Sequence, residues 1–132
     1  MEITFEVNRS IPIREIIALY NDSGLNRPTA DVERIEKMYM HSNLIISAWH
    51  GSELVGIARS LTDHCYCCYL SDLAVKKSYQ KQGIGKTLIE KTRAIIGEET
   101  MLLLLSAPTA MDYYPKIGME NLVNAFAIKR SR

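Results

Sequence analysis

Residues 80–87, QKQGIGKT, combine two glycines with a lysine and a threonine, a set of residue types that often holds phosphate groups. The end of this stretch, GIGKT, looks like part of an ATP-binding P-loop. A P-loop begins with a glycine five positions before its G-K-T, and Gln80 stands there instead. A dinucleotide-binding loop, G-x-G-x-x-G, would need a third glycine where Leu88 stands. Both nucleotide-binding loops are therefore excluded.

The remaining pattern is Q-x-x-G-x-G over residues 80–85, which lies between a strand expected to end at Val75 and a helix expected to run from Gly83 to Ile96. Glycines allow the backbone to turn tightly and to approach a ligand closely. The unpaired N–H groups of a first helical turn and the positive end of its dipole suit a pyrophosphate. Two glycines that open a helix are also compatible with a simple tight turn.

A second pattern, AMDYYPKIGM over residues 110–119, lies near the C-terminus. Together the two patterns resemble the GCN5-related N-acetyltransferase (GNAT) family, which carries (Q/R)-x-x-G-x-(G/A) after a strand ending like L-A-V and, later, A-x-x-F-Y-x-K-x-G-F. The residues that match the later pattern are Ala110, Tyr114, Lys116 and Gly118. Those that depart from it are Tyr113, Pro115 and Met119.

The resemblance implies that acetyl-CoA is the cosubstrate. Its pantetheine arm would lie between two parallel strands near residues 69–75 and 101–106, and its pyrophosphate would rest on residues 80–85. The residues implied to bind acetyl-CoA are Leu73, Ala74, Val75, Gln80, Lys81, Gln82, Gly83, Ile84, Gly85 and Lys86. Backbone N–H groups around Leu73 to Val75 would also polarise the acetyl carbonyl.

Two residues are candidates for moving protons. The resemblance implies that Tyr114 is the general acid for the departing thiolate, while an aromatic ring packed at a helix start is the competing interpretation. Asp72 is a candidate general base. Strand alternation places it on the face opposite Tyr69 and Ser71 unless a bulge re-aims it, and a structural hydrogen bond is the alternative role.

The order of hydrophobic patterns predicts one α+β domain over residues 1–132. The resemblance implies a mixed, mostly antiparallel sheet, flanked by helices, with a central parallel strand pair splayed at the acyl-CoA site. Strands are expected near residues 2–7, 44–49, 54–61, 65–75, 101–106 and 122–128, and helices near 13–20, 32–41, 83–96 and 108–117. The run MLLLLS at 101–106 is too apolar for a wet face, which suits a parallel strand covered on both sides.

The composition limits the kinds of partner that the protein is expected to bind. The net charge of +1 argues against binding to nucleic acid or to a membrane surface. No apolar run approaches the roughly 18 residues of a membrane span. We therefore expect a cytoplasmic protein. Cys65, Cys67 and Cys68 fall in one expected strand, where they are predicted to be small buried side chains with free thiols. Their spacing does not suit a zinc site, so no metal is expected.

The function expected from these features is transfer of an acetyl group from acetyl-CoA to a primary amine of a small molecule or peptide, by direct attack in a ternary complex. The alternative is a module that binds or senses acyl-CoA without turning it over. The sequence does not identify the amine, and it leaves open whether the protein is a homodimer.

Overall fold

Five strands form one sheet in a computed structural model that describes residues 2–132. In sheet order they are β1 (Thr4–Val7), β2 (Leu44–His50), β3 (Glu53–Thr62), β4 (Cys67–Val75) and β5 (Met101–Leu103). The helices are α1 (Ile13–Ser23), α2 (Val32–Met40), α3 (Ile84–Ile96) and α4 (Tyr113–Lys116), with short 3-10 turns at Lys77–Tyr79 and Pro108–Ala110. Strands β1 to β4 are antiparallel and β5 is parallel to β4, which confirms the predicted mixed sheet.

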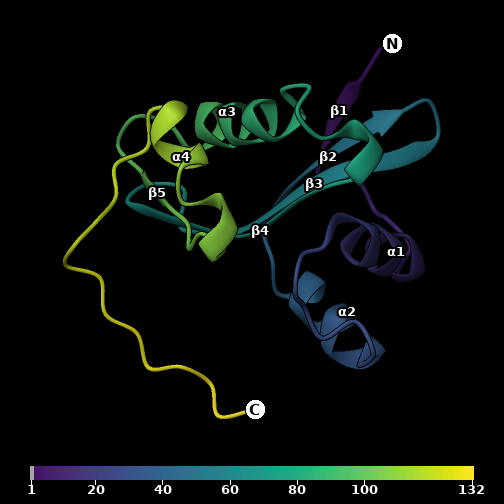
Figure 1. The fold of residues 1–132 in the computed structure, drawn as a ribbon, viewed down its shortest axis with the longest axis horizontal. Helices are drawn as coiled ribbons and strands as arrows, with labels where there is room; N and C mark the ends of the chain where they lie inside the picture. Colours follow the sequence, from purple (N-terminus) through teal and green to yellow (C-terminus); the bar gives the residue numbers. More distant parts are fainter. Residues whose placement is uncertain (1) are drawn as a thin grey trace.

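The helices form two layers on the sheet, with α3 and α4 on one face and α1 and α2 on the other (Figure 1). Each face buries its own apolar cluster, because the strands alternate their side chains between the two layers. Ile84 and Leu88 belong to the cluster under α3, and Ile16 and Leu19 to the cluster under α1. The two layers hold the end of β4 from both sides.

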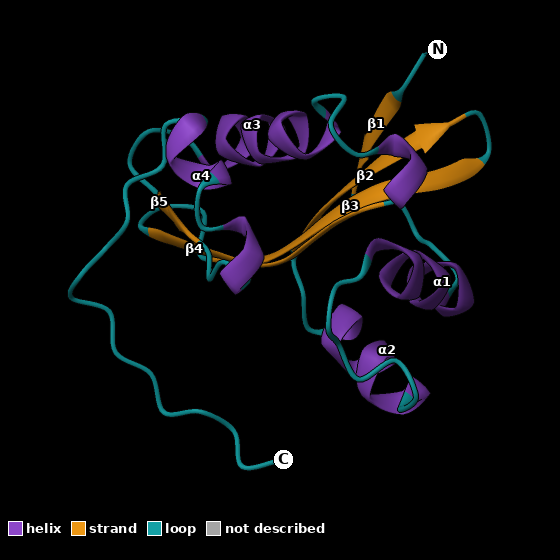
Figure 2. Ribbon diagram, viewed as in Figure 1, coloured by secondary structure: helices purple, strands orange, loops and turns teal. Residues whose placement is uncertain are grey.

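Gly56, in the second strand of the hairpin of β2 and β3, lies directly under α3. Figure 2 shows this hairpin. A Cβ atom added to Gly56 would lie 3.2 Å from Ile84 Cγ2 and 3.2 Å from Leu88 Cδ1. These distances are shorter than ordinary carbon contacts, which lie near 3.5–4.0 Å. The missing side chain of Gly56 therefore allows α3, and with it the glycine-rich loop, to lie close to the sheet.

We expect Gly56→Val to destabilise the protein by about 1–3 kcal/mol, because α3 must move away from β3 to make room for the larger side chain. Thermal unfolding followed by circular dichroism would measure the loss. Ser52→Val, at the exposed turn of the same hairpin, is the matched control and should change stability by less than about 0.5 kcal/mol. Equal melting temperatures for the two variants would contradict tight packing at Gly56.

One predicted strand is absent. Residues 122–128 form no strand, so β5 lies at the edge of the sheet. The parallel pair was expected to be central, and it lies at this edge instead. The physical reason is that backbone groups of residues 120–132 find no hydrogen-bond partner within the described residues 2–132. β5 is also shorter than predicted and ends at Leu103.

The cysteines differ from the prediction in burial. Cys68 is buried, whereas Cys65 and Cys67 are exposed, and all three are free thiols. A carboxylate oxygen of Asp63 accepts hydrogen bonds from the backbone N–H groups of residues 65, 66 and 67, at 2.8–3.0 Å, and this turn holds Cys65 outside the strand. Within residues 2–132, no group of three or more His, Cys, Asp or Glu side chains is placed to hold a metal ion. None of the described helices has the length and apolar character to cross a bilayer.

Candidate acyl-CoA site

The parallel strands separate where the sequence predicted a splay. β4 and β5 pair at Cys67 with Met101, Cys68 with Leu102 and Tyr69 with Leu103, and then the pairing ends. β4 continues to Val75, so residues 70–75 have no strand beside them on that edge in the described chain. An edge of this kind offers backbone donors and acceptors to a ligand that lies along it.

The glycine-rich loop presents a set of free backbone donors at the N-terminus of α3. Lys81 and Gly83 both adopt left-handed backbone conformations, with φ of 64° and 84°. The first helical hydrogen bond runs from the N–H of Thr87 to the carbonyl of Gly83, at 3.0 Å. Within residues 2–132, the N–H groups of residues 81–86 find no acceptor. A left-handed residue followed by a right-handed one, as at Gly83 and Ile84, builds an anion-binding nest, and the helix dipole adds to the attraction.

Lys81 has a strained, left-handed backbone conformation, which supports a ligand-binding role for the glycine-rich loop. A non-glycine residue with positive φ costs free energy, roughly 1 kcal/mol or more, and such residues gather at ligand-binding sites. Gly83, the N-cap residue of α3, has no side chain that could cap the helix, so the N–H groups of the first turn stay free within residues 2–132. These residues fit the pyrophosphate of an acyl-CoA.

Gly85 connects the nest to the splayed strand. A Cβ atom added there would lie 3.9 Å from Val75 Cγ2 and 4.0 Å from Leu73 Cδ2, both at the end of β4. The same position lies 3.5 Å from the hydroxyl of Tyr113. The start of α3 therefore lies against the end of β4, and a longer side chain at Gly85 would extend between Val75, Leu73 and the hydroxyl of Tyr113.

Gln80 joins the loop to the rest of the fold. Its side-chain amide donates a hydrogen bond to the carbonyl of Val75 at 2.8 Å, so it fixes the loop against β4. Nearby, the N–H of Lys77 donates to the carboxylate of Asp22 at 2.9 Å, which ties the same connection to the end of α1. Lys86 is exposed and lies 3.9 Å from Glu90.

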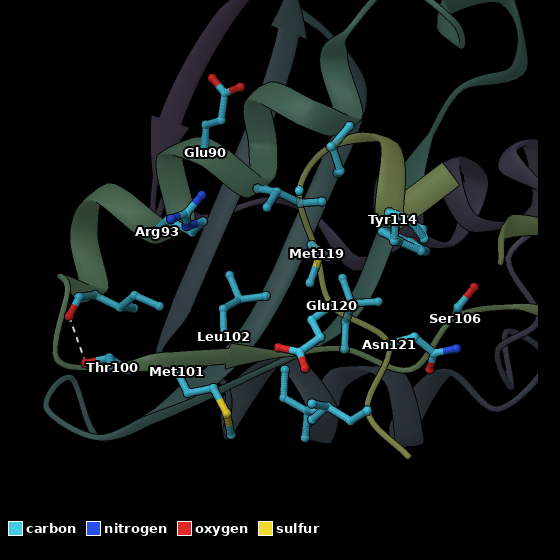
Figure 3. Close-up of a pocket in the computed structure, with 18 of the residues that line it drawn as sticks. Glu90, Arg93, Thr100, Met101, Leu102, Ser106, Tyr114, Met119, Glu120 and Asn121 are labelled. Carbon is cyan, nitrogen blue, oxygen red and sulfur yellow. Dashed lines mark hydrogen bonds between the residues drawn. The ribbon is translucent and has the colours of Figure 1, made fainter. Parts of the chain in front are cut away.

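The two adjacent tyrosines point to different places. The ring of Tyr114 packs against the apolar cluster under α3 and lines a groove between α3 and β5 (Figure 3). The hydroxyl of Tyr113 lies at the glycine-rich loop, beside Gly85. Burial raises the pKa of both hydroxyls, so each is protonated at neutral pH and is a weaker acid than a free tyrosine. The sequence did not predict that Tyr113 would lie beside Gly85. Tyr113 was noted there only as the residue that replaces phenylalanine in the family pattern.

Asp72 lies in a buried ion network. Its side chain is fully buried and accepts hydrogen bonds from Arg27 Nε at 2.6 Å and Arg59 Nε at 2.7 Å. The hydroxyl of Tyr20 donates to the same carboxylate at 2.8 Å, and that of Ser71 donates at 3.2 Å. Burial raises the pKa of this carboxyl, but the bonds and charges of Arg59 and Arg27 outweigh it and hold the pKa below the usual value. A carboxylate in this state is a weak base.

A bulge in β4 sets the direction of Asp72. The register of β3 and β4 shifts between Arg59 and Ser60, which leaves Ser71 as an extra residue in β4. Leu70 and Leu73 consequently pack against the same cluster under α3, although simple alternation would place them on opposite faces. The bulge turns Asp72 toward α1, where Tyr20 and Arg27 bind it.

A mixed sheet whose parallel pair separates beside a glycine-rich helix N-terminus defines an acetyltransferase fold. Residues 18–129 match the family described as "Acetyltransferase (GNAT) domain". The chain belongs to the GNAT family of acetyltransferases, which confirms the resemblance seen in the sequence.

Individual relatives agree with this assignment. The chain is 29% identical over 130 residues to the soybean (Glycine max) protein "Histone acetyltransferase TAP1", covering 90% of this chain and 56% of that protein. It thus spans about half the length of this relative. A GNAT family acetyltransferase from Streptococcus pneumoniae superposes with a TM-score of 0.79 at 25% identity, covering 98% and 99% of the two chains. An aminoglycoside N-acetyltransferase in complex with CoA shares the fold, with a TM-score of 0.73, 13% identity and coverage of 99% and 96%.

Proposed function

We propose that this protein transfers an acetyl group from acetyl-CoA to a primary amine of a small molecule or peptide. The observation that carries the proposal is that two sets of unpaired backbone groups, those of residues 81–86 and those on the free edge of β4, lie next to each other where Gly85 approaches Leu73 and Val75. Membership of the GNAT family supports acetyl transfer. The CoA held by an enzyme of the same fold supports the choice of donor.

The chain would contribute binding and orientation. The nest holds the pyrophosphate, and the N–H groups of Leu73 and Val75, which alternate away from β3, polarise the acetyl carbonyl and stabilise the negative charge that develops on its oxygen. Because the loop and α3 cover one face of β4, the amine reaches the acetyl group from the face that carries α1 and α2 (Figure 1). Held in this way, the amine nitrogen attacks the carbonyl directly.

Two protons have to move during this reaction. An alkylamine with a pKa of about 10 is mostly protonated at neutral pH and must lose a proton before it attacks. Asp72, occupied by Arg27 and Arg59, is poorly suited to accept it, so we propose that the proton passes to water. The departing thiolate takes a proton from a tyrosine hydroxyl, and the second proton, which the nitrogen loses as the amide forms, passes through water and restores that hydroxyl.

The donor hydroxyl is tested by Tyr113→Phe and Tyr114→Phe, which each remove one oxygen. The resemblance indicates Tyr114, whereas the geometry places the hydroxyl of Tyr113 beside the acyl-CoA loop. We expect the larger loss for Tyr113→Phe, about tenfold to 100-fold in kcat, because a thiol with a pKa near 8.5 already leaves fairly well. CoA affinity, measured by calorimetry, should hardly change in either variant.

Each variant is the control for the other. A large kcat loss for Tyr114→Phe together with a mild effect of Tyr113→Phe would assign the donor to Tyr114 and require its ring to turn toward β4 in the ternary complex. Equal and small effects would show that the proton comes from water.

The function itself is tested by thiol release from acetyl-CoA in the presence of a panel of amines, with mass spectrometry of the products. Thiol release that depends on an amine, and an acetylated amine as product, would support the proposal. CoA binding without turnover across the panel would favour the sensing module, which the engagement of Asp72 by two arginines also favours. Failure to bind CoA would contradict both.

A further inference from the structure

Arg27, in the connection between α1 and α2, brings a positive charge to the face of β4 from which the amine is proposed to arrive. Its guanidinium donates to the carbonyl of Ser71 at 2.7 Å and to the carboxylate of Asp72 at 2.6 Å. Leu73, whose N–H group is proposed to bind the acetyl carbonyl, comes two residues after Ser71, which is roughly 7 Å along a strand. The cation therefore lies within reach of a small acceptor held at the acetyl group.

The ion network around Asp72 has one positive charge in excess. Arg27 and Arg59 both pair with this single carboxylate, and within residues 2–132 neither arginine makes a second ion pair. The side chain of Arg59 is 7% exposed, whereas that of Arg27 is 27% exposed. A ligand that arrives from solvent therefore meets the excess charge at Arg27.

Arg27 also has hydrogen-bond donors that the fold does not use. A guanidinium carries five N–H donors. The bonds to Asp72, Ser71 and the carbonyl of Asn26 occupy one donor on each of its three nitrogens. Each terminal nitrogen thus keeps one N–H without an acceptor in the described part of the chain, residues 2–132. A carboxylate suits this group, because planar guanidinium donors and carboxylate oxygens match in geometry as well as in charge.

The same face of the sheet carries three apolar side chains, Leu61, Tyr69 and Leu103, which we call the apolar row. Tyr69 pairs with Leu61 of β3 and with Leu103 of β5, so the three share one face. Cys68 and Leu70, on either side of Tyr69, belong to the cluster under α3, so the row lies on the opposite face. Leu61 and Tyr69 are 40% and 37% exposed, so the helices on that face leave the row partly uncovered.

We propose that the acceptor is an apolar α-amino acid, whose carboxylate pairs with Arg27 while its side chain lies on the apolar row. The proposal rests on acetyl transfer as the function of the protein and names its acceptor. Tyr69 lies two residues before Ser71, and Leu73 lies two residues after it, so the row, the cation and the acetyl carbonyl follow one another along β4. An amine, a carboxylate and a side chain on one carbon atom can reach these three places together.

The charge at Arg27 selects among amines in two ways. A second ammonium group on the acceptor would be repelled by it, and this repulsion is stronger beside a partly buried network than in bulk water. A carboxylate on the acceptor would by itself stabilise the protonated amine, and pairing with Arg27 offsets that effect. The neutral amine is the form that attacks the acetyl group, so the ion pair favours reaction as well as binding.

The first test compares L-phenylalanine with phenethylamine, which differ only in the carboxylate. Wild type is assayed by thiol release from acetyl-CoA at several pH values, so that kcat/KM is expressed per neutral amine. We expect L-phenylalanine to be preferred by about tenfold to 100-fold, because charge-assisted bonds to a carboxylate are strong. Spermidine, a polycation, should be a poorer acceptor than either. Equal or lower kcat/KM for L-phenylalanine would overturn the proposal.

The second test removes the cation. Arg27→Gln should lose the preference for L-phenylalanine over phenethylamine, mainly through a higher KM for L-phenylalanine. Arg34→Gln removes the same charge from an exposed position on α2 and should keep the preference. A smaller folded fraction of either variant lowers both rates alike, so the ratio of the two acceptors reports recognition and not stability. A preference that survives in Arg27→Gln would contradict the role of Arg27.

A third comparison tests the apolar row, since glycine has the amine and the carboxylate but no side chain. We expect kcat/KM for glycine to be about tenfold lower than for L-phenylalanine, and equal values would overturn the apolar part of the acceptor class. Acetylation of amines with no preference for amino acids would overturn the acceptor class and leave acetyl transfer standing. CoA binding without acetylation of any amine would overturn both.

Discussion

Replacing Gly85 by glutamate should weaken CoA binding about 100-fold or more while the protein remains folded. The new carboxylate would enter the space between the loop and the end of β4, beside Leu73 and Val75. It would there repel the pyrophosphate and fill the path of the acyl arm, and a like-charge contact of this kind costs several kcal/mol, where about 1.4 kcal/mol equals tenfold in affinity. Isothermal titration calorimetry with CoA measures the change.

Folding should tolerate this variant for a physical reason. Gly85 lies in the first turn of α3 with an ordinary backbone conformation, and a negative charge near a helix N-terminus is stabilising. Gly85→Ala is the size control, since its Cβ would make contacts of 3.5 Å or longer and should cost little affinity. Ala94→Glu is the charge control, because it adds the same charge nine residues further along α3, about 13 Å from the loop. Undiminished affinity of a folded Gly85→Glu variant would refute the proposed CoA site.

Asp72→Asn should destabilise the protein by about 3–5 kcal/mol, because removal of one charge leaves the others of a buried network without compensation. Arg59, which is only 6% exposed, would lose its carboxylate partner. Arg27, which lies nearer the surface, would lose the same carboxylate. The hydroxyl of Tyr20 also donates to this carboxylate. Urea unfolding at neutral pH measures the free energy of unfolding.

The matched control is Glu53→Gln, which breaks the ion pair of Glu53 with Lys76 on the surface. Both of those side chains are partly exposed, so the change should be within about 1 kcal/mol. If Asp72→Asn destabilised the protein no more than this control, the buried network would not be what holds α1 against β4.

The effect of Asp72 should also depend on pH. Its folded-state pKa lies below the unfolded value of about 3.9, so its contribution is complete above that value and is lost as the pH falls through the folded pKa. The stability difference between wild type and Asp72→Asn should therefore narrow below about pH 4. A constant difference down to pH 2 would contradict the lowered pKa.

Local patterns were sufficient to predict much of the fold and the glycine-rich loop. The helix expected over residues 83–96 is α3, Ile84–Ile96, because glycines with positive φ lie at both of its ends. The Q-x-x-G-x-G pattern indicated a phosphate site from backbone chemistry alone, and the free N–H groups of the loop agree with it. Such features depend on neighbouring residues, which a sequence displays directly.

Features that depend on distant residues were not predictable. Asp72 was a candidate base because nothing in the sequence shows that Arg27 and Tyr20, 45 and 52 residues earlier, would bind it. The bulge at Ser71 arises from the register between two strands, and a single strand does not reveal it. Apolar residues at 122–128 indicated a strand, but not that these residues would pair with no other strand within residues 2–132.

The extra residue at Ser71 affects how this protein can evolve. Before the bulge, Leu70 faces the layer of α3, and after it Leu73 faces the same layer while Ala74 faces the layer of α1. Deleting one residue here would exchange the faces of every later side chain in β4 and turn the strand end that borders the loop. Individual side chains in this part of β4 can therefore vary among descendants more freely than the number of residues that the strand contains.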